Sequence, residues 1–355
     1  MTRFEYSTDQ EIALDAILDW HHRQDAQYLT MGGYAGTGKS TLVGQLAEEL
    51  PGVVTAALCG KAAHVLRAKG AQAQTVHSLI YAPRKGPDGR VQFRRRQTLD
   101  AEMVIVDESS MIDQLLIRDL LSFGLPVLFV GDHGQLEPIG PNPNLMADPN
   151  IRLETIHRQA MGNPILRLVT AFREDRPIPL WEDPEGRLAV RSRADFDRLV
   201  TPDMQIICGR NKTRHKVNAQ VRDLRGYSGR LVCPGDTLMC LKNNKRLGIF
   251  NGQQVQVLEI EHEGRSAIDL TVRSDDGRTF TVPALRRQFG ADRIDDFEDK
   301  LVAQMDYGYC LTAHKAQGSE WASVLVLEEI SPHWDARRWR YTVATRAKER
   351  LIYCR

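Results

Sequence analysis

A glycine-rich run carries the residues whose chemistry is easiest to interpret. Gly33-Tyr-Ala-Gly-Thr-Gly-Lys-Ser40 follows the apolar residues 28–31 and precedes a helical pattern at 41–50. Glycines let backbone N–H groups curl around an anion, the lysine reaches the β- and γ-phosphates, and the serine hydroxyl can ligate Mg²⁺. A glycine-rich turn with a chance Lys-Ser pair is the simpler alternative, which the strand and helix context disfavours. We expect the nucleoside triphosphate to contact Gly33, Gly36, Thr37, Gly38, Lys39, Ser40 and Thr41.

Two adjacent carboxylates end the apolar run Met103-Val-Ile-Val-Asp-Glu108. Strand alternation directs the two side chains differently, so Asp107 can hold Mg²⁺ through water while Glu108 orients and deprotonates the attacking water. With Lys39 and Ser40, this pair indicates hydrolysis of the nucleotide rather than its storage. A solvated acidic strand end is the alternative for this segment taken alone.

The elements that must position these residues alternate between short β-rich runs and helical patterns. This alternation predicts an α/β fold with parallel sheets covered by helices, and ligand chemistry at the carboxyl edge of each sheet. We expect strands in the first half at residues 28–32, 53–58, 103–107 and 127–131. In the second half we expect strands at 205–208, 306–311, 324–327 and 350–353, and helices at 212–224 and 336–347.

Two segments interrupt these patterns. Residues 82–97 contain the turn signal Pro87-Asp-Gly89 and predict a small basic β-hairpin. Residues 247–300 hold short alternating segments separated by glycine turns, which is typical of a small antiparallel β-module. We therefore expect a first domain at 1–150, a second at 151–246 and 301–355, and the β-module inserted at 247–300.

Composition narrows the class of protein. The chain has 355 residues with 42% hydrophobic and 26% charged residues, values typical of a soluble globular protein. No apolar run approaches the ~20 residues that cross a bilayer, and no signal peptide is evident, so we expect an intracellular protein. The net charge of +1 means that nucleic-acid binding would depend on local basic patches. Six scattered cysteines without a Cys-x-x-Cys pair predict buried reduced thiols rather than a zinc site.

Ordered motifs resemble a known family. Asp-Glu-Ser-Ser at 107–110 and Gly-Asp-x-x-Gln-Leu-x-Pro at 131–138 are similar to the second and third motifs of superfamily 1 helicases, in particular the 5′-to-3′ branch that includes RecD and Dda. Further segments match in order, at 7–10, 60–63, 75–77, 153–159, 311–320 and 341–348, so the resemblance covers nearly the whole chain. It implies two RecA-like domains, a strand-separating pin at 82–97 and an SH3-like module at 247–300.

The resemblance also implies roles in nucleotide binding. Gln10 would read adenine, Gln135 would contact the γ-phosphate, and Gly318 and Glu320 of the fifth motif would contact the nucleotide.

Arg158 and Arg346 would be arginine fingers. A guanidinium from the second domain would reach the transferred phosphoryl group only when the cleft is shut, which would couple hydrolysis to domain closure. Either arginine taken alone is more often part of a surface ion pair.

Hydroxyls, amides and cations at loop ends make phosphate bonds that do not depend on base sequence. The expected contacts to a nucleic-acid backbone are Lys61, Thr75, His77, Asn211, His314 and Lys315. Capping or core positions are the alternatives for His77 and His314. Phe93 could stack on a base at a fork or pack under its own hairpin.

Together these features predict an ATP-dependent DNA helicase that uses Mg²⁺·ATP and acts on single-stranded DNA and on junctions with duplex. We expect a monomer, with replication or recombination proteins as further partners; the 5′-to-3′ polarity rests wholly on the resemblance. An RNA translocase and a nucleotide-dependent clamp without processive movement are the alternatives. The run Thr345-Arg-Ala-Lys disfavours a P-loop kinase.

Overall fold

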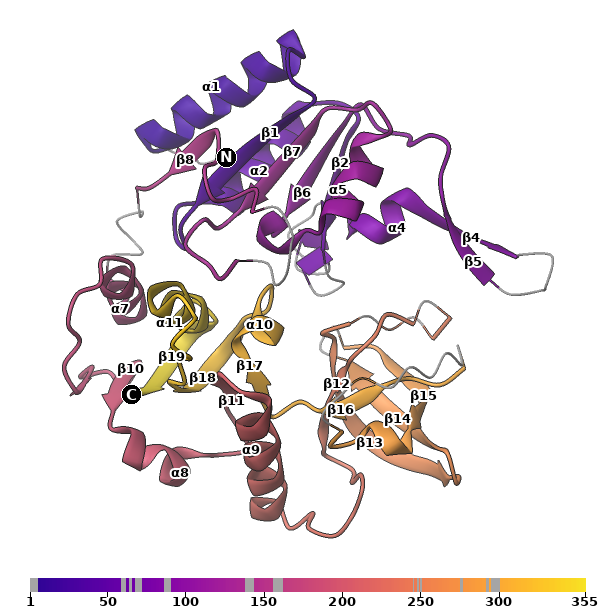
Figure 1. The fold of residues 1–355 in the computed structure, drawn as a ribbon, viewed down its shortest axis with the longest axis vertical. Coiled ribbons are helices and arrows are strands. Elements are labelled where there is room, and N and C mark those ends of the chain that lie inside the picture. The colour runs from indigo at the N-terminus through magenta and orange to yellow at the C-terminus, as the bar shows by residue number, and fades with distance from the viewer. Residues whose placement is uncertain are drawn as a thin grey trace. The chain divides into compact units, whose positions relative to one another are not determined.

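The chain divides into two compact units, Met1–Leu166 and Arg167–Arg355, and each is described here by itself (Figure 1). The computed structural model describes residues 6–58, 62–63, 66–67, 72–85, 91–137, 144–155, 162–244, 246–247, 249, 251–274, 277–291, 294 and 301–355. For residues 83–85 and 91–93 only the backbone is described.

The first unit is built on a six-stranded parallel sheet with the order β3-β2-β6-β7-β1-β8. Its strands are β1 (Tyr28–Gly33), β2 (Val53–Ala57), β3 (Ala73–Thr75), β6 (Met103–Asp107), β7 (Val127–Gly131) and β8 (Ile151–Leu153). The predicted parallel sheet is confirmed. Residues 151–153, which the sequence assigned to the second domain, pair with β1 here. Because β7 lies between β1 and β6, the loops that follow these three strands are consecutive along the carboxyl edge.

Helices cover both faces of this sheet, which explains why its central strands β6 and β7 are apolar along most of their length. The helices are α1 (Thr8–Arg23), α2 (Lys39–Glu49), α4 (Val76–Ile80) and α5 (Gln114–Leu121). Successive residues of a strand face opposite sides. Accordingly, Met103 and Ile105 pack with α1 and α2, whereas Val104 and Val106 pack with α4 and α5.

A two-stranded hairpin follows α4. Its strands, β4 (Tyr81–Lys85) and β5 (Val91–Arg95), are antiparallel and extend away from the sheet of the first unit (Figure 1). The tip, residues 86–90, lies outside the described residues. The side chains of Arg94, Arg95 and Arg96 are exposed. Its role as a pin stays a prediction.

The second unit contains a sheet with the order β17-β11-β18-β19-β10-β9, parallel except for the β9–β10 pair. Its strands are β9 (Trp181–Glu182), β10 (Leu188–Arg191), β11 (Gln205–Cys208), β17 (Cys310–Thr312), β18 (Trp321–Leu327) and β19 (Ala347–Cys354). Its helices are α8 (Phe196–Leu199), α9 (Asn211–Leu224), α10 (Ala313–Ala316) and α11 (Ala336–Ala344), while α7 (Pro164–Arg173) crosses the division between the units.

A five-stranded antiparallel sheet with the order β15-β14-β13-β12-β16 lies in the same unit around its own apolar core. Its strands are β12 (Thr237–Cys240), β13 (Gln254–Glu263), β14 (Ala267–Ser274), β15 (Thr279–Leu285) and β16 (Met305–Tyr307). The predicted segment 247–300 therefore holds three of the five strands, and β12 and β16 flank it. We keep its comparison with an SH3-like module as a prediction.

The single strand predicted at 306–311 is wrong. The chain forms two strands in different sheets, β16 with β12 and β17 with β11. Gly308 lies at the break, where its N–H donates to the carbonyl oxygen of Thr237 at 2.8 Å. A Cβ atom there would lie 3.2 Å from the backbone of Leu238, so glycine permits the crossing between sheets at this point.

Cys208, Cys233, Cys240, Cys310 and Cys354 are buried and free, which confirms the predicted buried thiols for these five positions. Cys59 lies outside the described residues. None of the helices in the described ranges combines the length and apolar character needed to cross a bilayer.

Candidate nucleotide and nucleic-acid sites

The glycine-rich loop joins β1 to α2 with the backbone that a phosphate-binding loop needs. Gly36 and Gly38 have φ angles of 83° and 80°, which side-chain-bearing residues rarely adopt. At Gly33 a Cβ atom would lie 2.7 Å from the Thr37 hydroxyl oxygen and 3.0 Å from Cγ of Lys39. Since α2 begins at Lys39, the N-terminus of this helix, with the positive end of its dipole, lies at the loop and favours an anion.

Lys39 bends back over its own loop. Its Nζ donates to the carbonyl oxygens of Gly33 at 2.6 Å and Tyr34 at 3.0 Å. A charged phosphate oxygen is a stronger acceptor than a carbonyl, so the ammonium can exchange these bonds for phosphate without moving far. Ser40 is exposed in the first turn of α2, and Thr41 follows it.

Gln10 lies against this loop rather than in solvent. Its side chain is fully buried, accepts a hydrogen bond from the Ser7 N–H at 3.0 Å and donates to the Thr37 carbonyl at 3.2 Å. The side chain therefore links the start of α1 to the phosphate loop. Its contact with adenine stays a prediction.

The two carboxylates after β6 differ in backbone conformation. Asp107 ends the strand and accepts a hydrogen bond from the Glu108 N–H at 2.8 Å. Glu108 is left-handed, with a φ of 53°, a conformation that costs a non-glycine residue on the order of 1 kcal/mol. The expectation that strand alternation separates the two side chains is therefore wrong, because β6 has already ended when the chain reaches Glu108.

Two buried serines fix the loop after β6 to the end of β7. The Ser109 hydroxyl donates to the Val130 carbonyl at 2.7 Å, and the Ser110 Oγ accepts from the Asp132 N–H at 3.0 Å. Gly131 permits this approach, since a Cβ atom there would lie 2.8 Å from the Ser110 Oγ. The carboxylates and the loop after β7 are thus held side by side.

The loop after β7 carries Gln135 and lies between the loop after β6 and the phosphate loop after β1. Gln135 is buried, and its amide donates to Asp132 Oδ2 at 3.4 Å, while Asp132 Oδ1 accepts from the Gly134 N–H at 2.9 Å. The His133 ring lies 4.0 Å, centroid to centroid, from that of Tyr34 in the phosphate loop. Burial lowers the pKa of His133 although Asp132 opposes the change, so the ring is neutral at pH 7. Sequence reasoning missed His133, because an isolated histidine in a loop carries no spacing signal.

In the second unit Arg346 is held against the segment that contains Gly318 and Glu320. The guanidinium is buried and donates from Nε to the Thr342 carbonyl at 3.1 Å and from Nη1 to the Ser319 carbonyl at 3.2 Å. Its Nη2 donates to the Thr345 hydroxyl at 2.9 Å.

Gly318 makes the turn with a φ of 69°, and the half-exposed Glu320 pairs with Lys348 at 3.2 Å. Three of the residues predicted around the nucleotide in this unit, Gly318, Glu320 and Arg346, therefore lie together. Arg158 falls outside the described residues.

The predicted nucleic-acid contacts of the first unit have structural roles of their own. Thr75 caps α4 by accepting a hydrogen bond from the Ser78 N–H at 3.1 Å. The His77 ring lies 5.8 Å from that of Tyr81. Lys61 and the side chain of Phe93 are outside the described part of the chain. These assignments stay predictions.

In the second unit three predicted contacts lie in the helices that follow two neighbouring strands. Asn211 is exposed at the start of α9, after β11, while His314 and Lys315 lie in α10, after β17. Burial lowers the pKa of His314, whose ring meets Trp334 edge to face at 6.4 Å. Burial, helped by the nearby Arg214, lowers the pKa of Lys315 to about 8.

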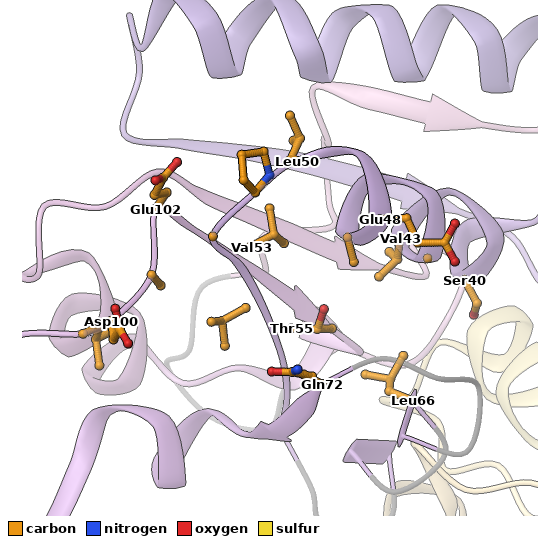
Figure 2. A pocket seen from close by; sticks show the side chains of 17 residues that line it. Ser40, Val43, Glu48, Leu50, Val53, Thr55, Leu66, Gln72, Asp100 and Glu102 are labelled. Atoms are coloured by element: carbon orange, nitrogen blue, oxygen red, sulfur yellow. The ribbon is translucent and has the colours of Figure 1, made fainter.

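A cavity also lies elsewhere in the first unit. It has a volume of about 810 Å³ and is lined by α2, the turn after it, β2 and the segment before β6 (Figure 2). Glu48, Asp100 and Glu102 contribute carboxylates that repel phosphate, and Ser40 alone belongs to the phosphate loop. This cavity is therefore not the phosphate site.

Comparison with known proteins agrees with this geometry. Residues 5–191, just over half of the chain, match the AAA domain family, and residues 307–353 match the UvrD-like helicase C-terminal domain. The ATP-dependent RecD2 DNA helicase of Deinococcus radiodurans is 32% identical over 384 residues, which cover 98% of this chain and 48% of that protein. The Dda DNA helicase of phage T4 is 31% identical over 145 residues, 38% of this chain and 32% of Dda.

Solved structures agree on the fold. Pif1 helicases solved at forked double-stranded DNA share the fold with a TM-score of 0.63 and 18% identity, over 99% of this chain and 92% of theirs. Bacteroides Pif1 bound to single-stranded DNA has a TM-score of 0.58 and 17% identity, with the same coverage. The chain belongs to the AAA domain family, among the superfamily 1 helicases of the RecD, Pif1 and Dda type. The resemblance drawn from the sequence is confirmed.

The chain spans about half of the length of its RecD2 relative. It spans 30% of a probable conjugal transfer protein TraA from Sinorhizobium fredii, to which it is 27% identical over 360 residues, 90% of this chain.

The residues present fit the Mg²⁺-nucleotide that this family of helicases implies. Mg²⁺ in nucleotide sites is held by one or two protein oxygens, by water and by phosphates rather than by a full protein cage. Ser40, in the first turn of α2, and Asp107, at the end of β6, would supply those oxygens. No group of three His, Cys, Asp or Glu side chains in the described ranges could hold a metal ion by itself.

Proposed function

We propose that the chain is an ATP-dependent DNA helicase that couples hydrolysis of Mg²⁺·ATP to 5′-to-3′ translocation on single-stranded DNA and to separation of duplex. The main support for this proposal is the strand order of the first sheet. It brings Lys39, Gln135 and the pair Asp107–Glu108 to consecutive connections at the carboxyl edge of the sheet. A relative named as an ATP-dependent DNA helicase and a fold shared with DNA-bound Pif1 support the substrate.

In this proposal the phosphates bind in the loop from Gly33 to Thr41, with Lys39 and Gln135 at the γ-phosphate. Ser40 ligates Mg²⁺ and Asp107 holds it through water. Bound Mg²⁺ would neutralise charge on the phosphates. Glu108 accepts the proton of the attacking water, and Gln10 contacts adenine. The left-handed backbone of Glu108 supports this role, because strained residues often lie at functional sites.

The second unit supplies cations and nucleotide contacts in the same proposal. Arg346 and Arg158 stabilise charge on the transferred phosphoryl group, while Gly318 and Glu320 contact the nucleotide. The hydrogen bond from Arg346 to the Ser319 carbonyl ties the finger to these contacts. Closure of the two RecA-like domains would therefore be needed for turnover.

The nucleic-acid track consists of Lys61, Thr75, His77, Asn211, His314 and Lys315 in this proposal. Alternating grip by the two domains moves the strand, the hairpin at 82–97 separates the duplex, and Phe93 stacks at the fork. The module at 247–300 is SH3-like, and the chain acts as a monomer, with replication or recombination proteins as partners.

The test is an unwinding assay on partial duplexes that carry either a 5′ or a 3′ overhang. We expect ATP-dependent unwinding only from the 5′ overhang, and ATP hydrolysis that single-stranded DNA stimulates more than matched RNA. Lys39→Ala is the control for contaminating activity. Preference for the 3′ overhang would refute the polarity, stimulation by RNA alone would refute the substrate, and stimulation without unwinding would favour the clamp.

A further inference from the structure

We propose that Glu329 is a positioning residue that sets the start of α9, and with it Asn211, for contact with a nucleic-acid backbone. Glu329 lies just after β18, next to the end of β11 in the parallel sheet. The inference deepens the proposed function and rests on it, because it concerns how the strand is gripped.

The Glu329 carboxylate binds three groups around the first turn of α9. It accepts hydrogen bonds from the N–H groups of Gly209 at 3.1 Å and Arg210 at 3.2 Å, and from the Thr213 hydroxyl at 2.7 Å. Only 10% of its side chain is exposed, and Arg193 approaches it at 3.6 Å. The carboxylate thus satisfies N–H groups that the turn into α9 leaves without helical partners, as a cap does.

Gly209 gives independent support, because the two backbones meet there. A Cβ atom on Gly209 would lie 2.2 Å from the carbonyl oxygen of Glu329 and 2.7 Å from its Cβ. Any side chain would push the loop after β18 away from α9. The two loops are therefore closely packed through their backbones as well as linked through side-chain hydrogen bonds.

The neighbouring carboxylate anchors the same loop from the other side. Glu328 accepts hydrogen bonds from Arg340 of α11, at 2.8 Å from Nη2, and from the Tyr353 hydroxyl at 2.6 Å. The bond to Glu328 raises the pKa of Arg340 despite partial burial. Since α11 leads directly into Arg346, the loop that holds α9 is also fixed to the element that carries the predicted finger.

A positioning role and a purely electrostatic role predict opposite changes in nucleic-acid binding when Glu329 is neutralised. A carboxylate beside a nucleic acid repels phosphate, so electrostatics alone predicts that its neutralisation strengthens binding. If Glu329 instead held the first turn of α9 in place, neutralisation would weaken binding. Neutralisation of a structural residue far from the nucleic-acid track would leave binding unchanged.

The experiment measures the concentration of single-stranded oligonucleotide that gives half-maximal stimulation of ATP hydrolysis. We expect Glu329→Gln to raise it about fivefold, the equivalent of one helix cap, and to leave hydrolysis without DNA unchanged. Glu349→Gln, a matched change at an exposed position of β19, should leave both values unchanged. Gly209→Ala disturbs the same contact from the other loop and should act in the same direction as Glu329→Gln.

An unchanged or lower half-maximal concentration in Glu329→Gln would overturn the inference, as would a parallel loss of hydrolysis without DNA. Thermal unfolding of each variant shows whether a change comes from loss of the fold, and a Glu329→Gln variant that is unfolded would also contradict a role confined to the track. If DNA fails to stimulate the unmodified chain, the proposed function is refuted instead, so the two failures are distinguishable.

Discussion

We expect the affinity for single-stranded DNA to fall steeply between about pH 7 and pH 9.5 because of Lys315. Burial, with a contribution from Arg214, lowers the pKa of this lysine from 10.5 to about 8, and Asp306 compensates only in part. Asp306 compensates only in part because it forms a buried ion pair with Arg214 at 2.7 Å. A nucleic-acid phosphate would supply the anion that Lys315 needs and would return its pKa toward the usual value.

The size of the effect follows from this difference in pKa. Each pH unit of pKa corresponds to ~1.4 kcal/mol, so keeping the ammonium charged costs the free protein about 3 kcal/mol. If the phosphate restores a pKa near 10.5, DNA binding takes up a proton above about pH 8. The affinity then falls about 25-fold between pH 7 and pH 9.5.

Folding stability should change in the opposite direction over the same range. Between about pH 8 and 10.5 the unfolded chain binds more protons at Lys315 than the folded chain does, so the free energy of unfolding rises with pH. Lys315→Met should therefore stabilise the free protein by up to about 3 kcal/mol at pH 7, and this gain should vanish as the pH approaches 10.5.

The assay is fluorescence anisotropy with a single strand of deoxyadenylate, whose bases do not titrate in this range, at constant ionic strength. Lys315→Met should bind more weakly at pH 7 and lose the pH dependence. The control, Lys216→Met, removes a charge from an exposed position of α9 and should retain the pH dependence of binding. An affinity of the unmodified chain that stays constant over this range, or a pH dependence that survives in Lys315→Met, would refute the reasoning.

Three further predictions concern the catalytic residues and the hairpin. Lys39→Ala should lose ATP hydrolysis, and Glu108→Gln should keep ATP binding while its turnover falls about 100-fold or more; appreciable hydrolysis by Glu108→Gln would exclude it as the base. Arg346→Lys should lower kcat about a thousandfold, since an ammonium cannot replace the planar guanidinium, and an unchanged kcat would exclude the finger. Deletion of residues 84–95 should spare DNA-stimulated hydrolysis but weaken unwinding in a gel-based strand-displacement assay, and normal unwinding would exclude the pin.

The first sheet was predictable because its strands carry their own signals. Val104, Val106 and their neighbours form apolar runs that end at glycines or carboxylates, and one such run precedes the phosphate loop. Those local signals locate strands but not their order. The position of β7 between β1 and β6, which makes the loop with Gln135 the neighbour of the loop with Glu108, is a property of the assembled sheet.

The second unit was less predictable because one continuous run of strand-like residues is divided between two sheets. Residues 305–312 are β-formers on both sides of Gly308, yet they serve two sheets. The contacts of Glu328 and Glu329 could not be predicted, since Arg340 lies 12 positions from Glu328 and the groups that donate to the Glu329 carboxylate lie 116 to 120 positions away. Contacts of this kind depend on tertiary structure, which spacing along the chain does not reveal.

The hydrogen bonds of Arg346 fix its guanidinium and leave part of its donor capacity unused. A guanidinium has five N–H donors, and Arg346 uses three of them on the carbonyls of Thr342 and Ser319 and on the Thr345 hydroxyl. Two donors remain without a hydrogen bond to the described part of the chain. They lie on the two Nη atoms, the pair that faces both oxygens of a phosphoryl group in a bidentate contact. In the proposed function, Arg346 would therefore contact phosphate while it stays bonded to the segment with Gly318 and Glu320, and this contact would be transmitted to the predicted nucleotide contacts of the same unit.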